Sequence, residues 1–165
     1  MSEVTVPVLI VGGGGCGLSL ASFLADAGVE PLLVERRAGT SNQPRAHYLN
    51  QRTMEVLRAH GIADDVYALG MPMENVEVRW CTTMGGTGEL EGREMYRMDA
   101  FGGGSLLETY QRDSPCLSSN LPQHRFEPIL RAHAEQRNPD RIRFGHEVIA
   151  SEQDADGVTT TVRVV

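Results

Sequence analysis

The chain has 165 residues, of which 41% are hydrophobic, so it is long enough to form one domain around a buried core. Its net charge of -7 disfavours nucleic acid and anionic membranes as partners, because both recruit proteins through excess positive charge. All 15 basic residues are arginine, which excludes chemistry that depends on lysine, such as Schiff-base catalysis and nucleotide binding by a P-loop.

The first predicted elements form a βαβ unit. Residues 6–11 (VPVLIV) are a short β-branched run that ends at glycine, which indicates a buried strand. A helix is predicted from about Cys16 to Ala27, with Gly28 as its C-terminal stop, and residues 31–35 (PLLVE) indicate a second buried strand. Two strands joined through a glycine turn and a helix in this way pair in parallel through a right-handed crossover.

A polar loop leads from the βαβ unit to a second helix. Asn50 is a suitable N-cap, and the helix is predicted to run through Met54 and Leu57 to Gly61.

A β-hairpin is predicted next. Residues 76–84 (VEVRWCTTM) alternate apolar with polar side chains, which indicates a half-buried antiparallel strand with Trp80 in the core. Residues 93–98 (REMYRM) are the expected partner strand, and residues 100–120 have the composition of a loop.

The C-terminal part is predicted to contain one helix and several short strands. The helix is expected from about Arg125 to Gln136, and it tolerates Pro128 only if that residue lies within the first turn. Residues 141–144 and 146–151 indicate short strands. The second of these is followed by DADG and by the alternating residues 158–165, which is typical of a hairpin.

Between the first strand and the first helix, Gly12, Gly14 and Gly17 form a GxGxxG motif. The first glycine permits a tight turn, the second lets the backbone approach a pyrophosphate, and the third allows the helix to pack closely on the strand. Gly13 and Gly15 occupy the intervening positions, and we expect other small residues to replace them. The motif predicts an adenine dinucleotide site.

Glu35 ends the second strand, at the place where an acidic residue accepts hydrogen bonds from a ribose hydroxyl and would repel a 2′-phosphate. The alternative is a glycine-rich turn that binds no ligand, with Glu35 in solvent. Cys16 lies at the start of the helix, where we expect a small residue beside a phosphate rather than a reactive thiol.

Three further segments are more specific: residues 44–55 (PRAHYLNQRTME), residues 99–115 (DAFGGGSLLETYQRDSP) and the LPQ of residues 121–123, which precedes a helix. Together with the glycine motif, they resemble the class A flavoprotein aromatic hydroxylases, most closely the branch of 2,4-dichlorophenol 6-monooxygenase and phenol hydroxylase. The resemblance covers nearly the whole chain.

The resemblance implies FAD as cofactor, with NADPH or NADH as electron donor, and hydroxylation of a small phenolic substrate with O₂, ortho to its hydroxyl group. Arg36 would lie near the adenosine and Arg45 near the flavin, and Gln123 matches a glutamine that contacts the flavin. The implied cofactor-binding residues are Gly12, Gly14, Gly15, Cys16, Gly17, Glu35, Arg36, Arg45 and Gln123.

Arg45 and His47 are two residues apart, so in an extended loop their side chains lie on one side. An arginine can form paired hydrogen bonds with phosphate, and a histidine can accept a proton near neutral pH. We hypothesise that His47 is the catalytic residue that accepts the phenolic proton, because a phenolate is the more electron-rich target. The alternative is a loop histidine bonded to backbone or flavin.

The expected fold class is α/β. Residues 1–73 and 121–165 would form a Rossmann-like FAD-binding domain of the glutathione-reductase type, and residues 74–120 the start of an antiparallel substrate-binding sheet. Because members of the family are much longer, we expect a truncated domain that is inactive by itself, with exposed sheet edges that favour homo-oligomers.

Two other function classes stay open. An NAD-dependent dehydrogenase would explain the glycine motif and Glu35, but not an antiparallel insertion where a third parallel strand is expected. A noncatalytic module that binds a dinucleotide or another protein partner is the other.

Cysteine content and apolar runs give the remaining expectations. Cys16, Cys81 and Cys116 are too scattered for a disulfide framework or a zinc site, and the histidines show no metal-ligand spacing. No apolar run is long enough to span a bilayer, and no secretory signal pattern is present. We expect a cytoplasmic protein with reduced thiols and no metal.

Overall fold

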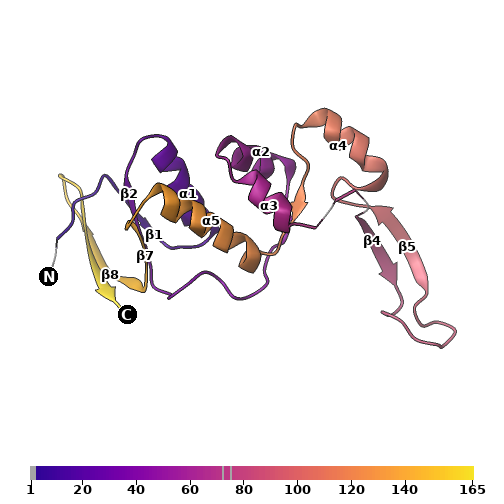
Figure 1. Cartoon of the computed structure of the whole chain (residues 1–165). Coiled ribbons are helices and arrows are strands. Elements are labelled where there is room, and N and C mark those ends of the chain that lie inside the picture. Colours follow the sequence, from indigo (N-terminus) through magenta and orange to yellow (C-terminus); the bar gives the residue numbers. More distant parts are fainter. Residues whose placement is uncertain (1–2, 72, 75) are drawn as a thin grey trace. The chain divides into compact units, whose positions relative to one another are not determined.

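The computed structural model of the protein describes residues 3–71, 73–74 and 76–165 (Figure 1). The chain divides into two compact units, which are Met1–Ala46 with Pro122–Val165, and His47–Leu121. Residues 47–73, which are predicted above to belong to the FAD-binding domain, therefore group with the residues that follow them. The residue ranges of the functional domains stay a prediction.

The first unit contains, among its described residues, a parallel sheet of three strands. β1 (Val8–Val11), α1 (Gly15–Asp26) and β2 (Pro31–Glu35) follow one another, and β7 (Ile142–Phe144) pairs with the other side of β2 (Figure 1). The register places Glu35 of β2 beside Phe144 of β7. The βαβ unit and the α/β class are confirmed, and the third parallel strand comes from late in the chain.

Apolar side chains from α1, β2 and α5 (Gln123–Arg137) form the core of this unit. Leu18, Leu33 and Leu130, one from each element, are fully buried, and burying a leucine stabilises a fold by roughly 2 kcal/mol relative to exposing it. α1 packs against both α5 and β2. The core therefore fixes the start of α1 relative to the first turns of α5.

The start of α5 differs from the prediction. The helix begins at Gln123, directly after Pro122, so Pro128 lies inside the helix and beyond its first turn. The expectation that Pro128 lies in the first turn is wrong. Proline has no N–H to donate to the carbonyl of His124, but Pro128 is exposed, so water can reach that carbonyl.

The first unit ends in an antiparallel hairpin of β8 (His146–Gln153) and β9 (Val158–Val164). In the turn between them, Asp154 Oδ1 accepts hydrogen bonds from the backbone N–H groups of Asp156 and Gly157, both at 2.9 Å. Gly157 has a φ of +155°. The predicted hairpin and its turn are confirmed.

The second unit combines short helices with two small antiparallel pairings. β3 (Tyr48–Leu49) pairs with β6 (Ser119–Asn120), and β4 (Glu77–Cys81) pairs with β5 (Glu94–Asp99). The helices of this unit are α2 (Gln51–Ala59), α3 (Ala63–Leu69) and α4 (Leu107–Asp113), with a 3₁₀ turn at Gly104–Leu106.

Two helices of the second unit were not predicted. α3 and α4 have only 7 residues each, and no side chain caps either of them. The prediction of residues 100–120 as a loop is therefore wrong over α4. A helix this short has little intrinsic stability, so it depends on packing that a local pattern does not encode.

The β4–β5 hairpin exposes the residue that was expected in the core. Trp80 is 44% exposed and lies opposite Tyr96, with 5.4 Å between the ring centroids. On the other face, Arg97 forms ion pairs at 3.6 Å with both Glu77 and Glu94. The placement of Trp80 in the core is wrong, because no described residue adds a strand to this pair, and alternation alone supplies no covering layer.

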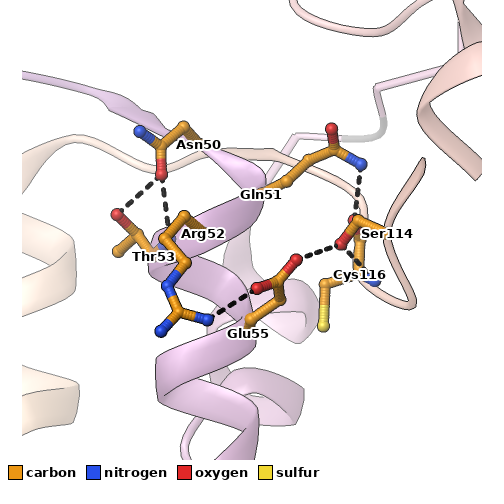
Figure 2. A network of polar contacts seen from close by, with 7 residues as sticks. All are labelled: Asn50, Gln51, Arg52, Thr53, Glu55, Ser114 and Cys116. Atoms are coloured by element: carbon orange, nitrogen blue, oxygen red, sulfur yellow. Dashed lines mark hydrogen bonds and ion pairs between the residues drawn. The ribbon is translucent and has the colours of Figure 1, made fainter.

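The N-terminus of α2 is held by a polar network that Figure 2 shows. Asn50 Oδ1 accepts hydrogen bonds from the backbone N–H and the hydroxyl of Thr53, at 2.8 and 2.9 Å, so the predicted N-cap is confirmed. Gln51 donates to the carbonyl of Cys116 at 2.9 Å. Ser114 donates to Glu55 at 2.7 Å, and this hydrogen bond lowers the pKa of Glu55. The network fastens the segment after α4 to α2.

Tyr67 provides a test of how α3 packs against the segment that contains Leu117. Its hydroxyl donates to the carbonyl of Leu117 at 2.6 Å, and burial raises its pKa to about 12. An unfolded tyrosine has a pKa of about 10, so the unfolded state loses this proton first and stability falls as pH rises from about 10 to 12. We expect Tyr67→Phe to remove this part of the alkaline loss in denaturant titrations.

The control for that titration is Tyr96→Phe, because Tyr96 is 59% exposed on the β4–β5 hairpin. It should leave the alkaline slope unchanged. Equal slopes in Tyr67→Phe and in the parent would contradict the role given to the Tyr67 hydroxyl.

Candidate functional site

The chain passes from β1 into α1 through the predicted glycines. Gly12 has a φ of +114°, which glycine adopts at no steric cost. A Cβ on Gly17 would lie 2.0 Å from the main-chain oxygen of Gly12, so only glycine lets the helix pass this close to the turn. Gly14 is the N-cap of α1, and no side chain caps this helix. The first N–H groups of α1 therefore suit an anionic ligand.

Gly13 is more constrained than the sequence suggests. Its N–H donates to Glu35 Oε2 at 2.8 Å, and a Cβ on Gly13 would lie 2.8 Å from the Cβ of Glu35. The expectation that a small residue replaces Gly13 is wrong, because this hydrogen bond brings the turn against the end of β2. Gly15 does have space for a methyl group, since the nearest atom, in Leu130, would be 4.0 Å away.

Glu35 accepts a backbone hydrogen bond on each carboxylate oxygen. Oε2 accepts from Gly13, as above, and Oε1 accepts from the N–H of Arg37 at 2.8 Å. Each oxygen has a second lone pair, so the carboxylate can still accept a hydrogen bond from a hydroxyl group. Its place at the carboxyl end of β2, beside the glycine turn, fits the ribose of an adenine dinucleotide. Arg36 follows Glu35 and is exposed.

The loop after β2 surrounds an open polar hollow of about 400 Å³. Its lining includes two arginines, Arg37 and Arg45, and its other lining residues are Gly39, Thr40, Ser41, Asn42 and Gln43. The two guanidinium groups make this hollow suitable for a polyanionic ligand.

Gln123, the first residue of α5, is hydrogen-bonded to the segment that contains Arg45. The backbone N–H of Gln123 donates to the carbonyl oxygens of Arg45 and Ala46, at 3.2 and 3.1 Å. The side-chain amide of Gln123 donates to Glu127 Oε1 at 2.5 Å. Glu127 also accepts from the backbone N–H of Ser41 at 2.8 Å, through its other oxygen. The glycine turn, Arg45 and Gln123 are thus all in the first unit, as the sequence predicts.

Sequence reasoning missed Glu127. Its side chain is 2% exposed, which is unusual for a carboxylate. The signal was present, because Glu127 precedes Ile129 and Leu130, which are also buried on α5, and lies 4 residues after Gln123. A charged residue among the buried positions of a helix is a candidate for a specific role.

His47 lies in the second unit and is exposed. Its Nδ1 lies 3.0 Å from Asn120 Oδ1. An amide oxygen only accepts hydrogen bonds, so Nδ1 carries a proton and, in the neutral ring, Nε2 is the proton acceptor. The ring makes an edge contact with Phe101, at 6.4 Å between centroids. Asn120 therefore favours the tautomer in which Nε2 can accept a proton.

Phe101 is itself held in an uncommon conformation. It has a φ of +55°, which non-glycine residues rarely adopt, and its carbonyl accepts a hydrogen bond from the Ser118 hydroxyl. The Phe101 ring also contacts Tyr48, at 4.7 Å between centroids. Backbone strain of this kind concentrates at functional sites, so the surroundings of His47 are a second candidate region.

Within residues 3–71, 73–74 and 76–165, no helix is both long and apolar enough to cross a bilayer. In the same part of the chain, no three His, Cys, Asp or Glu residues are grouped so that they could hold a metal ion.

The chain is similar in sequence and in structure to known proteins. The chain is 38% identical over 162 residues to 2,4-dichlorophenol 6-monooxygenase of Delftia acidovorans, covering 97% of the chain and 26% of that protein. It is 35% identical to phenol 2-monooxygenase of Pseudomonas sp. strain EST1001, covering 96% of the chain and 25% of that protein. The crystal structure of the flavin-dependent monooxygenase PieE, in complex with FAD and substrate, superposes with a TM-score of 0.83 and 41% identity, over 98% of the chain and 27% of PieE.

The chain spans about a quarter of the length of these curated relatives, 26% and 25%. Residues 5–165 match the FAD binding domain family. That match covers almost the whole chain, and it agrees with the glycine turn, the uncapped start of α1 and the position of Glu35. The chain belongs to the FAD binding domain family.

Proposed function

We propose that the protein supplies the FAD-binding part of a flavin-dependent aromatic hydroxylase that acts on a phenol, with NADPH or NADH as electron donor. The observation that carries the proposal is the GxGxxG turn against Glu35 in a chain whose relatives are phenol and dichlorophenol monooxygenases.

In this proposal the first N–H groups of α1, at Gly14, Gly15 and Cys16, bind the pyrophosphate, and Gly12 and Gly17 shape the turn that makes room for it. Glu35 accepts hydrogen bonds from the adenosine ribose. Arg36 and Arg45 provide positive charge, and Gln123 contacts the flavin. When bound, FAD supplies the redox chemistry and the activation of O₂ that hydroxylation requires.

His47 is proposed to accept the phenolic proton at Nε2. Support comes from its hydrogen bond to Asn120, which places the other proton on Nδ1. Residues 1–73 and 121–165 are proposed as the FAD-binding domain and residues 74–120 as the start of the substrate-binding sheet, since β4 and β5 form an antiparallel hairpin with an apolar face. A cytoplasmic location and association between copies stay predictions.

The proposal is tested by identifying the bound cofactor. The purified protein is expected to be yellow, or to retain FAD through gel filtration after it is mixed with FAD, and to release flavin fluorescence when it is denatured. Tight binding of NAD without flavin would replace the proposal with a dehydrogenase, which the relatives do not favour. Failure to bind either dinucleotide would support a noncatalytic interaction module.

A further inference from the structure

We propose that Glu127 is a positioning residue of the cofactor site, which fixes the loop of Ser41 and sets the orientation of the Gln123 side-chain amide. The inference rests on the proposed function, because it concerns how Gln123 and Arg45 are presented to FAD. Glu127 itself would act through these residues and not by touching the cofactor.

Burial and hydrogen bonding single out Glu127 in the first unit. The side chain is 2% exposed, and its two oxygens accept from Ser41 N at 2.8 Å and from Gln123 Nε2 at 2.5 Å. Among the described residues, no ion pair with Glu127 is found. Burying a carboxylate without a neighbouring cation is unfavourable, because the charge loses its hydration. Such a group is stable in a fold only when specific hydrogen-bond donors offset that loss.

The start of α1 supplies part of that offset. A Cβ on Gly14 would lie 3.6 Å from Glu127 Oε1, so the carboxylate is close to the N-cap of α1. The N-terminus of a helix carries partial positive charge, which favours a nearby anion. Glu127 is therefore in contact range of the glycine turn as well as of the loop and of α5.

The bond to Gln123 determines which end of the amide remains for a ligand. A carboxylate only accepts, so Glu127 must receive the NH₂ group of Gln123, and the amide oxygen is left to accept from a hydroxyl or N–H group of the cofactor. The bond to Ser41 spans 86 residues of sequence and holds the loop that carries Arg45. One side chain thus connects the loop to the helix.

The Glu127→Gln variant separates orientation from simple packing. A glutamine at this position can accept from Ser41 with its oxygen and donate from its nitrogen, provided that the amide of Gln123 turns over to present its own oxygen. Both hydrogen bonds survive, so a packing role predicts unchanged behaviour. A positioning role predicts that the dissociation constant for FAD rises at least about tenfold, because the wrong end of the Gln123 amide meets the cofactor.

The double variant Gln123→Glu with Glu127→Gln is the second test. It exchanges donor and acceptor, preserves the net charge and keeps the bond between the two positions. We expect the cofactor-free protein to unfold at the same denaturant concentration as the parent, and FAD affinity to fall at least about tenfold. Parent-like FAD affinity in this variant would contradict the need for a particular donor and acceptor orientation at position 123, even if Glu127→Gln fails to fold.

The control is Glu135→Gln, which removes an exposed carboxylate from the same helix. It should bind FAD as the parent does, with the same flavin absorption spectrum. Parent-like FAD affinity in both Glu127→Gln and the double variant would overturn the positioning role alone. Failure of the parent to bind FAD would overturn the proposed function and this inference with it.

Discussion

Replacement of Gly17 by alanine is expected to lower the free energy of unfolding by about 3 kcal/mol, the upper end of the usual cost of overpacking. The added methyl group would lie 2.0 Å from the main-chain oxygen of Gly12, and a main-chain atom cannot turn aside as a flexible side chain can. To relieve the contact, α1 must move away from the turn. The N–H groups that the proposal assigns to the pyrophosphate move with it, so FAD affinity should fall at least about tenfold.

Gly15→Ala is the matched control, because it adds the same methyl group to the same helix. Its nearest neighbour would be Leu130, 4.0 Å away, and alanine is a better helix former than glycine. We expect it to unfold at the same denaturant concentration as the parent, or at a higher one. Equal stability of Gly17→Ala and Gly15→Ala would show that the close approach of helix and turn is not required.

His47→Ala is expected to slow hydroxylation about 100-fold while FAD binding is retained, since a general base typically contributes a factor of this size or larger. The assay measures hydroxylation of a phenol in a preparation that has this activity. His60→Ala, which changes the C-cap of α2, is the control and should hydroxylate at the parent rate. The loop-histidine alternative predicts equal rates for His47→Ala and the parent.

A change of substrate tests the same role chemically. A phenol that is already ionised at the pH of the assay needs no base, so the deficit of His47→Ala should shrink with such a substrate. Asn120→Leu should give an intermediate deficit, because it leaves the imidazole in place but removes the acceptor that holds the Nδ1 proton. A deficit of the same size with every phenol would contradict proton acceptance.

The sequence predicted the parts of the fold whose information is local. The βαβ unit was recognisable because its apolar runs, its glycine turn and its helix stop lie within one short segment, and Asn50 was recognisable as a cap for the same reason. The pairing of β7 with β2 could not be predicted, because it depends on residues that meet only in the folded chain. α3 and α4 were not predicted, because helices of 7 residues depend on tertiary packing for their stability.

In the candidate site, too, locally encoded features were predicted and features that depend on distant residues were not. The glycine motif and Glu35 follow from spacing, and Arg45 and Gln123 were found through the resemblance. Gly13 and Glu127 were missed, since the first is constrained by a contact with Glu35 and the second by a bond to Ser41, 86 residues away. Trp80 was misplaced because an alternating strand specifies an apolar face but not what covers it.

The large separation of β2 and β7 in the sequence has a consequence for biosynthesis. About one hundred residues separate β7 from the strand that it joins, and pairing over such a separation is slow, so completion of the parallel sheet should be slow. On the ribosome, β1, α1 and β2 emerge well before β7, and the unpaired side of β2 is then an exposed edge that can join another nascent chain. Chaperone capture during translation should therefore matter most between the synthesis of β2 and that of β7.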